Sequence, residues 1–285
     1  MKTKKATPYL YILPTMLIIA VVFAFPILEI FRLSFSSPEG TKFSLGNFQY
    51  IFSDPVFWAS VSHNLTLLIL VPIILGFALL LALFLYERVR GWLLHRSIVF
   101  LPYVMPIAVI GIAFSYLYQY NGIINLFLRS IGLGSFALDW LGSPKLVLPT
   151  IMTVIIWRET GFGVVLFLAR LLSLPQEVLE ASTVDGANWL QRHIYITMPQ
   201  LKPIIMFFVV TEAISMLTWV FSYVYVMSGG GPAFNSYVLE IYLWQSAFSL
   251  GSPGVASAIA VFLFVSSLLL IAVGYKYIVS EEEMI

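Results

Sequence analysis

The sequence predicts an all-α polytopic membrane protein with six transmembrane helices. Hydrophobic residues make up 60% of the 285 residues, charged residues make up only 10%, and the mean hydropathy is +0.95. A soluble domain of this size cannot bury so much apolar surface. The chain also contains six apolar stretches long enough to cross a hydrocarbon core of roughly 30 Å, which takes about 20 helical residues.

The six expected spans belong to one transmembrane domain, residues 1–285, without a linker or a low-complexity run. They cover approximately 9–30, 65–86, 98–118, 146–172, 203–227 and 255–278. We expect the first span to be retained rather than removed as a signal peptide. Its apolar run is too long for that role, and no small-x-small cleavage site follows it.

The distribution of lysine and arginine predicts the orientation. With the amino terminus inside, ten of them fall on the inner side and four on the outer side, while Arg158 falls within a span. The inner ten are Lys2, Lys4, Lys5, Arg88, Arg90, Arg96, Arg170, Arg192, Lys202 and Lys276. The outer four are Arg32, Lys42, Arg129 and Lys145. Because cytoplasmic loops carry the excess of basic residues, we expect both termini in the cytoplasm.

Several function classes are disfavoured by composition and motif. The chain has no cysteine, which excludes thiolate metal sites and disulfides, and its net charge of +1 argues against a nucleic-acid partner. The histidines His63, His95 and His193 lie in separate loops or span ends, so we expect no metal site. No G-x-x-x-x-G-K-[ST] motif occurs, so ATP and Mg²⁺ would have to be bound by a partner. A membrane enzyme is the main rival from another class, but no nucleophile elbow or H-E-x-x-H motif supports it.

A polar segment, residues 173–202, interrupts the apolar sequence between spans 4 and 5. Ser173 stands three residues before Gln176, a capping-box pattern that predicts a short helix from there to about Val184. Asp185-Gly186 then predicts a turn, because glycine readily adopts positive φ.

A second short helix is expected from Ala187 to about Tyr195, and Met198-Pro199 is expected to end it. The two amphipathic helices would lie at the cytoplasmic face. They would either rest on lipid headgroups or dock into a protein partner. The acidic residues Glu177, Glu180 and Asp185 outnumber Arg192, which favours a protein groove over an anionic membrane surface.

The stretch "EASTVDGANWLQRHIYITMP" (residues 180–199) resembles the cytoplasmic loop of binding-protein-dependent ABC importer permeases. That loop has the pattern Glu-Ala-Ala, three residues, Gly, nine residues, Ile, one residue, Leu-Pro, and the spacing is the same here. Ser182 replaces an alanine and Met198 a leucine, while His193 stands where an aromatic residue is common. The resemblance implies that this loop couples to the ATPase through Glu180, Ala181, Ser182, Asp185, Gly186, Ala187, Ile196 and Pro199.

Other stretches narrow the resemblance to the maltose-type sugar permeases, and to the first permease of such a pair. They are "YLYILPTMLIIAVVFAFPILEIFRLSF", "FLPYVMP" followed by "YNGIINLFLRSIGL", and "MSGGGPAFNSYVLEIYLWQSAF". The family implies a type I ABC importer permease fold in the inner membrane of a prokaryote. It also implies a second, homologous permease, two ATP-binding cassette ATPases and an extracytoplasmic sugar-binding protein as partners.

Three charged residues, Arg158, Glu159 and Glu212, fall within predicted spans. A charge at the bilayer centre costs about 2.5–3.5 kcal/mol or more, so such residues usually face a cavity or a partner. Arg158 and Glu159 project about 100° apart on a helix. We therefore expect one to face the translocation path and the other to pack against span 5, with an Arg158–Glu212 pair. The alternative is a purely structural clamp.

The family resemblance implies a sugar site near mid-membrane, in span 4 just after a tryptophan and in the middle of span 5. Aromatic faces and charged hydrogen-bonding groups suit sugar rings and hydroxyls. The expected pathway residues are Trp157, Arg158, Glu159, Thr160, Phe162, Glu212, Ser215, Trp219 and Ser222. Trp219 also fits the aromatic belt at the membrane interface.

Two other transport functions stay open at this point. Amino-acid permeases share the cytoplasmic loop but usually lack the "GGGP" segment, and a glycerol phosphate ester is a further cargo class. A proton-coupled secondary transporter would work without an ATPase. The lack of an internal repeat counts mildly against that class.

Overall fold

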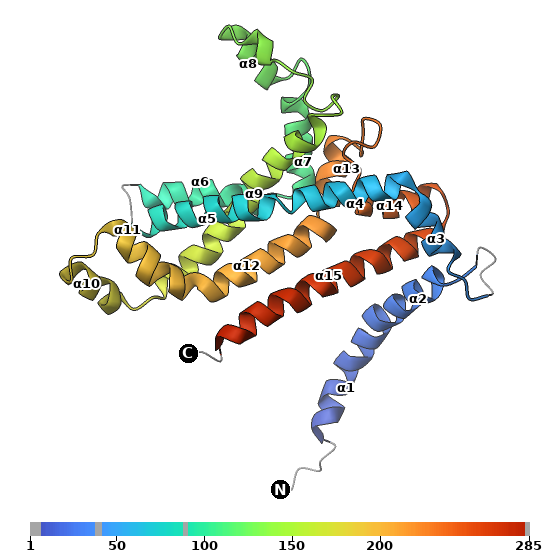
Figure 1. The fold of residues 1–285 in the computed structure, drawn as a ribbon, viewed down its shortest axis with the longest axis horizontal. Coiled ribbons are helices and arrows are strands. Elements are labelled where there is room, and N and C mark those ends of the chain that lie inside the picture. The colour runs from blue at the N-terminus through green and yellow to red at the C-terminus, as the bar shows by residue number, and fades with distance from the viewer. Residues whose placement is uncertain (1–6, 38–41, 88–90, 283–285) are drawn as a thin grey trace. The chain divides into compact units, whose positions relative to one another are not determined.

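Figure 1 shows the computed structural model, which describes residues 7–37, 42–87 and 91–282. Within these ranges the secondary structure is helical apart from one β-bridge between Ser36 and Phe43, which confirms the all-α prediction. The elements are α1 (Thr7–Ile19), η1 (Ala20–Ala24), α2 (Phe25–Ser34), α3 (Gly46–Ser53), α4 (Pro55–Leu67), α5 (Leu70–Tyr86), α6 (Trp92–Val104), α7 (Ile107–Leu117), α8 (Ile123–Ser130), η2 (Gly134–Phe136), α9 (Val147–Leu172), α10 (Gln176–Val184), α11 (Trp189–Arg192), η3 (His193–Thr197), α12 (Met198–Thr218), α13 (Phe221–Met227), α14 (Leu239–Trp244), η4 (Gln245–Ser249) and α15 (Pro253–Glu282).

Five helical stretches are long and apolar enough to cross a membrane, and a bent pair makes a sixth if it counts as one span. The five are Tyr11–Ser34, Pro55–Tyr86, Val147–Leu172, Trp189–Thr218 and Pro253–Gly274. Each overlaps one expected span. Pro55–Tyr86 begins ten residues earlier than the expected second span, and Trp189–Thr218 begins 14 residues and ends nine residues earlier than the expected fifth span. Five basic residues used to predict the orientation, Lys2, Lys4, Lys5, Arg88 and Arg90, lie outside the described residues.

The third expected span is the bent pair. Helices α6 and α7 meet at an angle of 98° instead of forming one straight rod. Met105, between them, has an extended backbone (φ −71°, ψ 141°) and is followed by Pro106. A proline disfavours the helical conformation of the residue before it, so the sequence Met-Pro explains where the helix breaks.

The described chain divides into two compact units. The first comprises residues up to Trp58 together with Tyr242–Val265. Its core is aromatic, with Phe57 fully buried and in edge-on contact with Phe262 at 5.1 Å between ring centroids. Asn47 donates from Nδ2 to the carbonyls of Leu33, Ser34 and Ser36, which satisfies acceptors left over at the end of α2.

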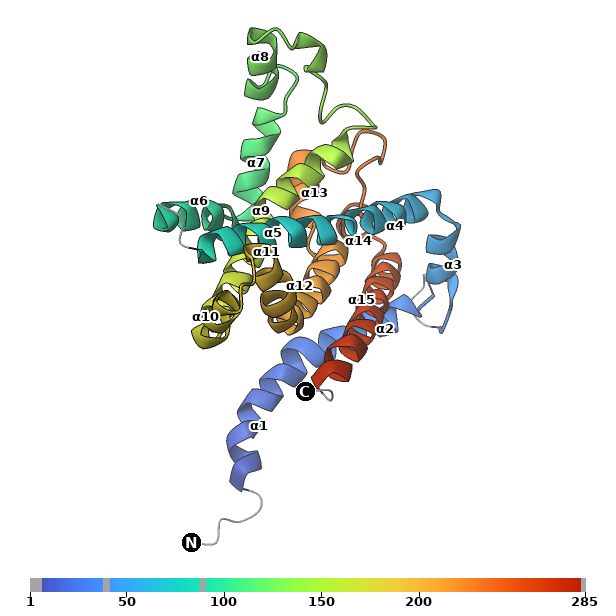
Figure 2. The same ribbon diagram turned by 60° about the vertical axis from the view of Figure 1, so that its left-hand side comes forward.

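The second unit comprises residues 59–241 and 266–285 and contains the candidate site. Helix α9 packs against α5, α6 and α12 there, and Figures 1 and 2 show these helices together. Gly163 permits the close approach, because a Cβ at this position would lie 2.6 Å from the Cβ of Ala78 and 2.9 Å from the ring of Phe208. Small residues bring helix backbones together in membranes, where the lipid provides no hydrophobic force for association.

The fifth span is also interrupted, between α12 and α13. Trp219 leaves the helical conformation there, with φ −130° and ψ 10°. Asn64 of α4 is buried at the break, donates from Nδ2 to the Met216 carbonyl at 3.0 Å and accepts from the Leu239 N–H at 3.0 Å. One amide side chain therefore pairs backbone groups from two separate segments that meet at the interruption.

Candidate functional site

The centre of the second unit holds a buried charged network on α9 and α13. Arg158 donates from Nη1 to Glu159 Oε1 at 2.6 Å, and the Tyr223 hydroxyl donates to the same oxygen at 2.7 Å. The two charged side chains retain exposures of only 12% and 13%, and Tyr223 is buried. The arrangement pairs the two charges locally, although among the described residues Arg158 Nε is buried without a hydrogen-bond partner.

One of Arg158 and Glu159 was expected to face the translocation path and the other to pack against span 5, but both contact the hydroxyl of Tyr223, which belongs to span 5. Their Cβ atoms do project about 100° apart, but the long arginine side chain turns back onto its neighbour. Its Nη2 also donates to the Tyr103 carbonyl of α6 at 3.1 Å, and its guanidinium carbon lies 5.0 Å from the Tyr103 ring centroid. Separating two opposite charges inside a membrane protein would leave both without partners, which costs more than this bend.

Glu212 of α12 does not form the expected ion pair with Arg158. It is only 2% exposed, and within the described residues its Oε2 has no hydrogen-bond partner. No ion pair between Arg158 and Glu212 occurs in the described part of the chain, because Glu159 already holds the guanidinium. Glu212 is therefore a buried carboxyl with one oxygen that no described residue uses.

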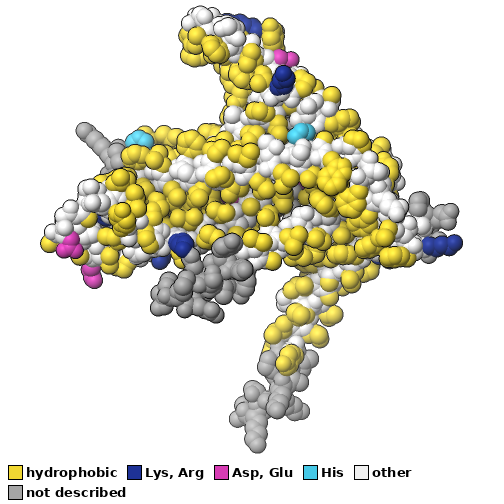
Figure 3. Space-filling model, in the orientation of Figure 1, with side chains coloured by type: hydrophobic (Ala, Val, Ile, Leu, Met, Phe, Trp, Pro, Cys, Tyr) yellow, Lys and Arg dark blue, Asp and Glu magenta, His cyan; other side chains and the backbone are white. Residues whose placement is uncertain are grey.

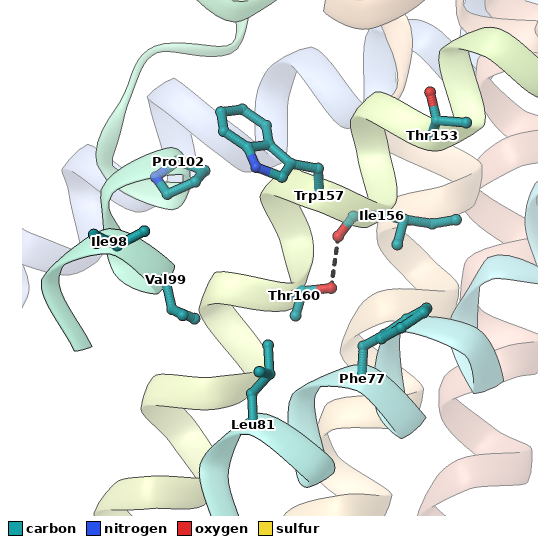
Figure 4. Close-up of a pocket in the computed structure, with 9 residues that line it drawn as sticks. All are labelled: Phe77, Leu81, Ile98, Val99, Pro102, Thr153, Ile156, Trp157 and Thr160. Atoms are coloured by element: carbon teal, nitrogen blue, oxygen red, sulfur yellow. Dashed lines mark hydrogen bonds between the residues drawn. The ribbon is translucent and has the colours of Figure 1, made fainter. Parts of the chain in front are cut away.

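Trp157 and Thr160 line a cavity of about 350 Å³ between α5, α6 and α9, drawn in Figure 4. Its other lining residues are Phe77, Leu81, Ile98, Val99, Pro102, Thr153 and Ile156. The Thr160 hydroxyl donates to the Ile156 carbonyl at 2.6 Å, the dashed line of Figure 4. Because that hydroxyl is engaged and most of the lining is apolar, the cavity supplies an aromatic surface rather than a set of hydrogen-bonding groups.

The remaining predicted pathway residues differ in exposure. Phe162 is half-buried and stacks on Tyr103 at 5.3 Å between ring centroids. Ser215 and Ser222 are also half-buried, on α12 and α13, whereas Trp219 at the break between them is 69% exposed. The structure thus joins Arg158 and Glu159 in one network and Trp157 and Thr160 in one cavity. It does not gather all nine predicted residues into a single pocket of this chain.

Tyr103 and Tyr223, which complete the charged network, were missed by sequence reasoning. Tyr223 lies four residues after Trp219, so helical spacing places it near that expected pathway residue. Tyr103 carries no comparable signal, since α6 packs on α9 only in the folded chain.

A second carboxyl, the half-buried Glu240 of α14, was also missed. It lies between the fifth and sixth spans and accepts the Val220 N–H at 3.1 Å through Oε2, at the start of α13. Burial disfavours its charged form and raises its pKa to about 8, although the N–H groups of Val220 and Phe221 act in the opposite direction. Glu240 therefore stabilises the interruption between α12 and α13, beside Trp219, and is mostly neutral at pH 7.

The raised pKa of Glu240 predicts a pH-dependent stability. Protonated Glu240 stabilises the fold fully below the ordinary carboxyl pKa, and this contribution is lost as the pH rises through about 8. We expect the thermal unfolding temperature of the purified transporter to fall from about pH 6 to about pH 9. Scanning fluorimetry on wild type and Glu240→Gln tests this. Glutamine keeps an acceptor oxygen but does not titrate, so its profile is expected to be flatter. Superimposable profiles would rule out Glu240 as the titrating group.

The polar segment between α9 and α12 contains the two expected short helices. Helix α10 ends at Val184 and is followed by Asp185 and by Gly186, whose φ is +79°. The Ala187 N–H donates to the Ser182 carbonyl at 3.0 Å and the Gly186 N–H to the Thr183 carbonyl at 3.2 Å. These two bonds form a Schellman motif, which requires a left-handed residue at the glycine. The predicted turn at Asp185-Gly186 is confirmed.

The capping box is present, but not where the sequence pattern placed it. Ser173 donates to the Arg170 carbonyl at 2.7 Å and does not cap α10. The box forms instead at the second helix, where Asn188 and Gln191 exchange backbone and side-chain hydrogen bonds of 2.9 Å each. A serine that follows a helix finds carbonyls of that helix within reach, which explains why Ser173 binds backward.

The prediction that Met198-Pro199 ends the second helix is wrong. Met198 is helical (φ −60°, ψ −43°), and the chain continues from α11 through the π-helix η3 into α12. A proline ring collides with the carbonyl four residues earlier in a regular α-helix. The wider π turn directly before Pro199 relieves this contact, so the polar segment leads without a break into the fifth span.

The predicted coupling residues lie on a polar, accessible segment. Glu180, Ala181, Asp185, Gly186 and Pro199 are exposed, Ala187 and Ile196 are half-buried, and Ser182 is buried. The acidic side chains on α10 appear at the left of Figure 3, beyond the hydrophobic surface of the spans. In the described part of the chain, no group of three or more His, Cys, Asp or Glu residues has the geometry to hold a metal ion.

The chain matches the model of a protein family described as the binding-protein-dependent transport system inner membrane component, over residues 74–280. It is 32% identical to the probable ABC transporter permease protein YurN of Bacillus subtilis (strain 168), with 98% of each chain covered. It is also 31% identical to the trehalose/maltose transport system permease protein MalF of Thermococcus litoralis, with 90% of this chain and 88% of the relative covered.

Two solved structures share the fold. One is a bacterial ABC transporter involved in the import of the acidic polysaccharide alginate, with a TM-score of 0.85, 24% identity and coverage of 94% of this chain and 93% of that chain. The other is a bacterial alginate ABC transporter in complex with an alginate pentasaccharide-bound periplasmic protein. Its TM-score is 0.82 at 23% identity, with coverage of 93% and 91% respectively.

Proposed function

The chain belongs to the family of binding-protein-dependent transport system inner membrane components, and from this premise we propose that it is the permease subunit of an ATP-driven sugar importer. It would form half of the translocation path through a prokaryotic inner membrane, with both termini in the cytoplasm. The polar segment 173–202 would pass the movement of an ATPase to the spans.

The observation that carries this proposal is the construction of the polar segment. Helices α10 and α11 are joined by a Schellman turn at Gly186, and the acidic residues Glu177, Glu180 and Asp185 of α10 and the turn are exposed. The segment then continues through η3 into α12 as one helical path. A rigid, accessible element that is continuous with a span suits the transmission of movement, because packed helices move as units rather than deforming.

The proposed partners follow from the missing phosphate-binding motif in this sequence and from the subunits that the family resemblance implies. No phosphate-binding motif occurs in the sequence, so two partner ATPases would bind ATP and Mg²⁺. A second, homologous permease would complete the translocation path, and an extracytoplasmic protein would deliver the cargo. In support, one structural neighbour is in complex with a periplasmic protein that holds an alginate pentasaccharide.

The proposed cargo class is a sugar, as the names of several relatives indicate for those proteins. The site offers matching chemistry, since Trp157 and Trp219 present accessible aromatic faces and Trp157 lies two residues before the carboxylate of Glu159. Both hydrogen bonds that Glu159 receives end on Oε1, which leaves Oε2 to accept a cargo hydroxyl. The second permease would complete this partial site.

Reconstitution tests the proposed function directly. The chain, the second permease, the two ATPases and the binding protein are placed in proteoliposomes, and uptake of labelled sugar is measured with ATP inside. We expect uptake that requires ATP and every component. Uptake by this chain alone in response to a proton gradient would contradict the proposal and favour a secondary transporter instead.

Trp219 provides a test of the sugar site. Replacing it by alanine removes a side chain that is 69% exposed, so we expect the amount of assembled complex to be unchanged. The apparent KM for sugar is expected to rise about threefold to tenfold, the scale of one aromatic contact. Trp219→Phe keeps an aromatic face and serves as the matched control. Unchanged kinetics in the alanine variant would assign Trp219 to the membrane interface rather than to cargo.

A further inference from the structure

A carboxylate at the end of α5 receives hydrogen bonds from two residues of the polar segment. Arg192 donates from Nη2 to Glu87 Oε1 at 3.3 Å, and His193 Nε2 lies 3.2 Å from the same oxygen. Glu87 is 105 and 106 residues away from these partners in the sequence. The contact therefore joins the cytoplasmic end of the second span to the junction of α11 and η3.

His193 makes this junction specific, because its ring is only 3% exposed. Nδ1 lies 3.2 Å from Thr197 Oγ1, and the ring packs edge-on against Trp189 at 4.4 Å between ring centroids. A buried imidazole needs a partner on each ring nitrogen. Glu87 provides the second partner, so removal of its carboxylate would leave a buried polar atom unsatisfied.

Arg192 extends the connection to α10. While Nη2 binds Glu87, Nη1 donates to the Thr183 hydroxyl at 3.4 Å. The two short helices of the polar segment are thus tied to one another and to α5 through a single guanidinium. A second tie runs to α9, where Arg170 Nε donates to the Gln200 carbonyl at 3.4 Å.

Helix α5 leads from this junction to the charged network. It packs closely along α9, where Ala78 faces Gly163 at a distance that leaves no room for another methyl group. Glu159 lies one helical turn before Gly163 on α9. Because close-packed helices transmit displacement, movement at Glu87 would reach the α9 residues that carry the candidate site.

We propose that Glu87 is a positioning residue that fastens the polar segment to the second span, so that movement of α11 is delivered to α5 and from there to α9. This inference rests on the proposed coupling role of the segment. The α10–α11 pair binds the ATPase, and Glu87 does not touch the ATPase, ATP or cargo. Its loss would therefore separate ATP hydrolysis from transport while leaving the ATPase docked.

The test uses the complete transporter in proteoliposomes and measures both sugar uptake and ATP hydrolysis. In Glu87→Ala we expect the number of ATP molecules hydrolysed per sugar to rise about tenfold, the scale of a lost charge-assisted hydrogen bond. Glu87→Gln keeps an acceptor oxygen and is expected to lie between wild type and alanine. Asp139→Asn is the control, because it removes the charge of an exposed carboxylate outside the polar segment and α5 and is expected to keep the wild-type ratio.

A crosslink reports docking separately from coupling. The chain has no cysteine, so Val184→Cys, at a position 88% exposed on α10, introduces a single reactive thiol. We expect it to crosslink to the ATPase in the wild-type and in the Glu87→Ala background alike. Arg192→Gln should change the ratio less in the Glu87→Ala background than in wild type, because the Arg192–Glu87 contact is already lost there.

The outcomes separate the two proposals. If Val184→Cys captures the ATPase and Glu87→Ala keeps the wild-type ratio of hydrolysis to uptake, the role of Glu87 is overturned while the proposed function stands. A crosslink lost only in Glu87→Ala also overturns it, because the carboxylate would then serve docking. If the wild-type background gives neither crosslink nor uptake, the proposed function itself fails.

Discussion

Replacing Gly186 by valine is expected to abolish sugar uptake while leaving the permease inserted in the membrane. Gly186 has a φ of +79°, and a β-branched residue strongly resists this left-handed conformation. The substitution would break the Schellman turn and redirect α11 relative to α10. The spans do not include Gly186, so insertion should not change. Uptake assays and immunoblots of membrane fractions measure the two quantities, and normal sugar accumulation in the Gly186→Val strain would contradict the expectation.

Gly186→Asn tests whether Gly186 is needed for its backbone conformation or for the space that its missing side chain leaves. A Cβ at Gly186 would meet no atom of this chain within 4 Å, so the chain itself does not require the missing side chain. Asparagine tolerates positive φ better than other residues with a side chain. We expect Gly186→Asn to restore most uptake if conformation is the only requirement. Failure of both variants, with α10 still folded, would show that a partner approaches the glycine closely.

Replacing Glu159 by alanine is expected to reduce both the assembled complex and the uptake. Arg158 would remain buried without its carboxylate, and breaking a buried pair in this way costs about 3–5 kcal/mol. The Tyr223 hydroxyl would lose its acceptor as well. Quantitative pull-down of the complex and uptake per complex give the two effects separately.

Glu159→Gln is the variant that tests binding of cargo. Glutamine keeps an oxygen that accepts from Tyr223 and Arg158 but carries no charge, so the complex should assemble. If Glu159 accepts a cargo hydroxyl, uptake per assembled complex should fall about tenfold, since charged hydrogen bonds are roughly twice as strong as neutral ones. Uptake per complex at the wild-type level would make the Arg158–Glu159 pair a structural clamp only.

The fold and the polar segment were largely predictable from local sequence. Long apolar stretches must be helical in lipid, because every backbone group has to be satisfied within its own segment. The turn at Gly186 was predictable for a related reason, since the dihedral preference of glycine is a property of one residue. Local signals predicted wrongly where two interactions compete for the same residue. Ser173 donates its hydrogen bond to the preceding helix α9 instead of capping α10, and the π-helix η3 allows the helix to continue through Pro199.

The charged contacts were decided only by the tertiary structure. Tyr223 reaches Glu159 across 64 residues of sequence, and Glu87 reaches His193 across 106. No periodicity connects such positions, because their distance depends on how whole helices pack. The sequence by itself determined that buried charges exist and that a polar segment lies between the fourth and fifth spans. Which partner neutralises each charge was settled by packing, since burial makes an unpaired charge costly and only the folded chain brings a partner within reach.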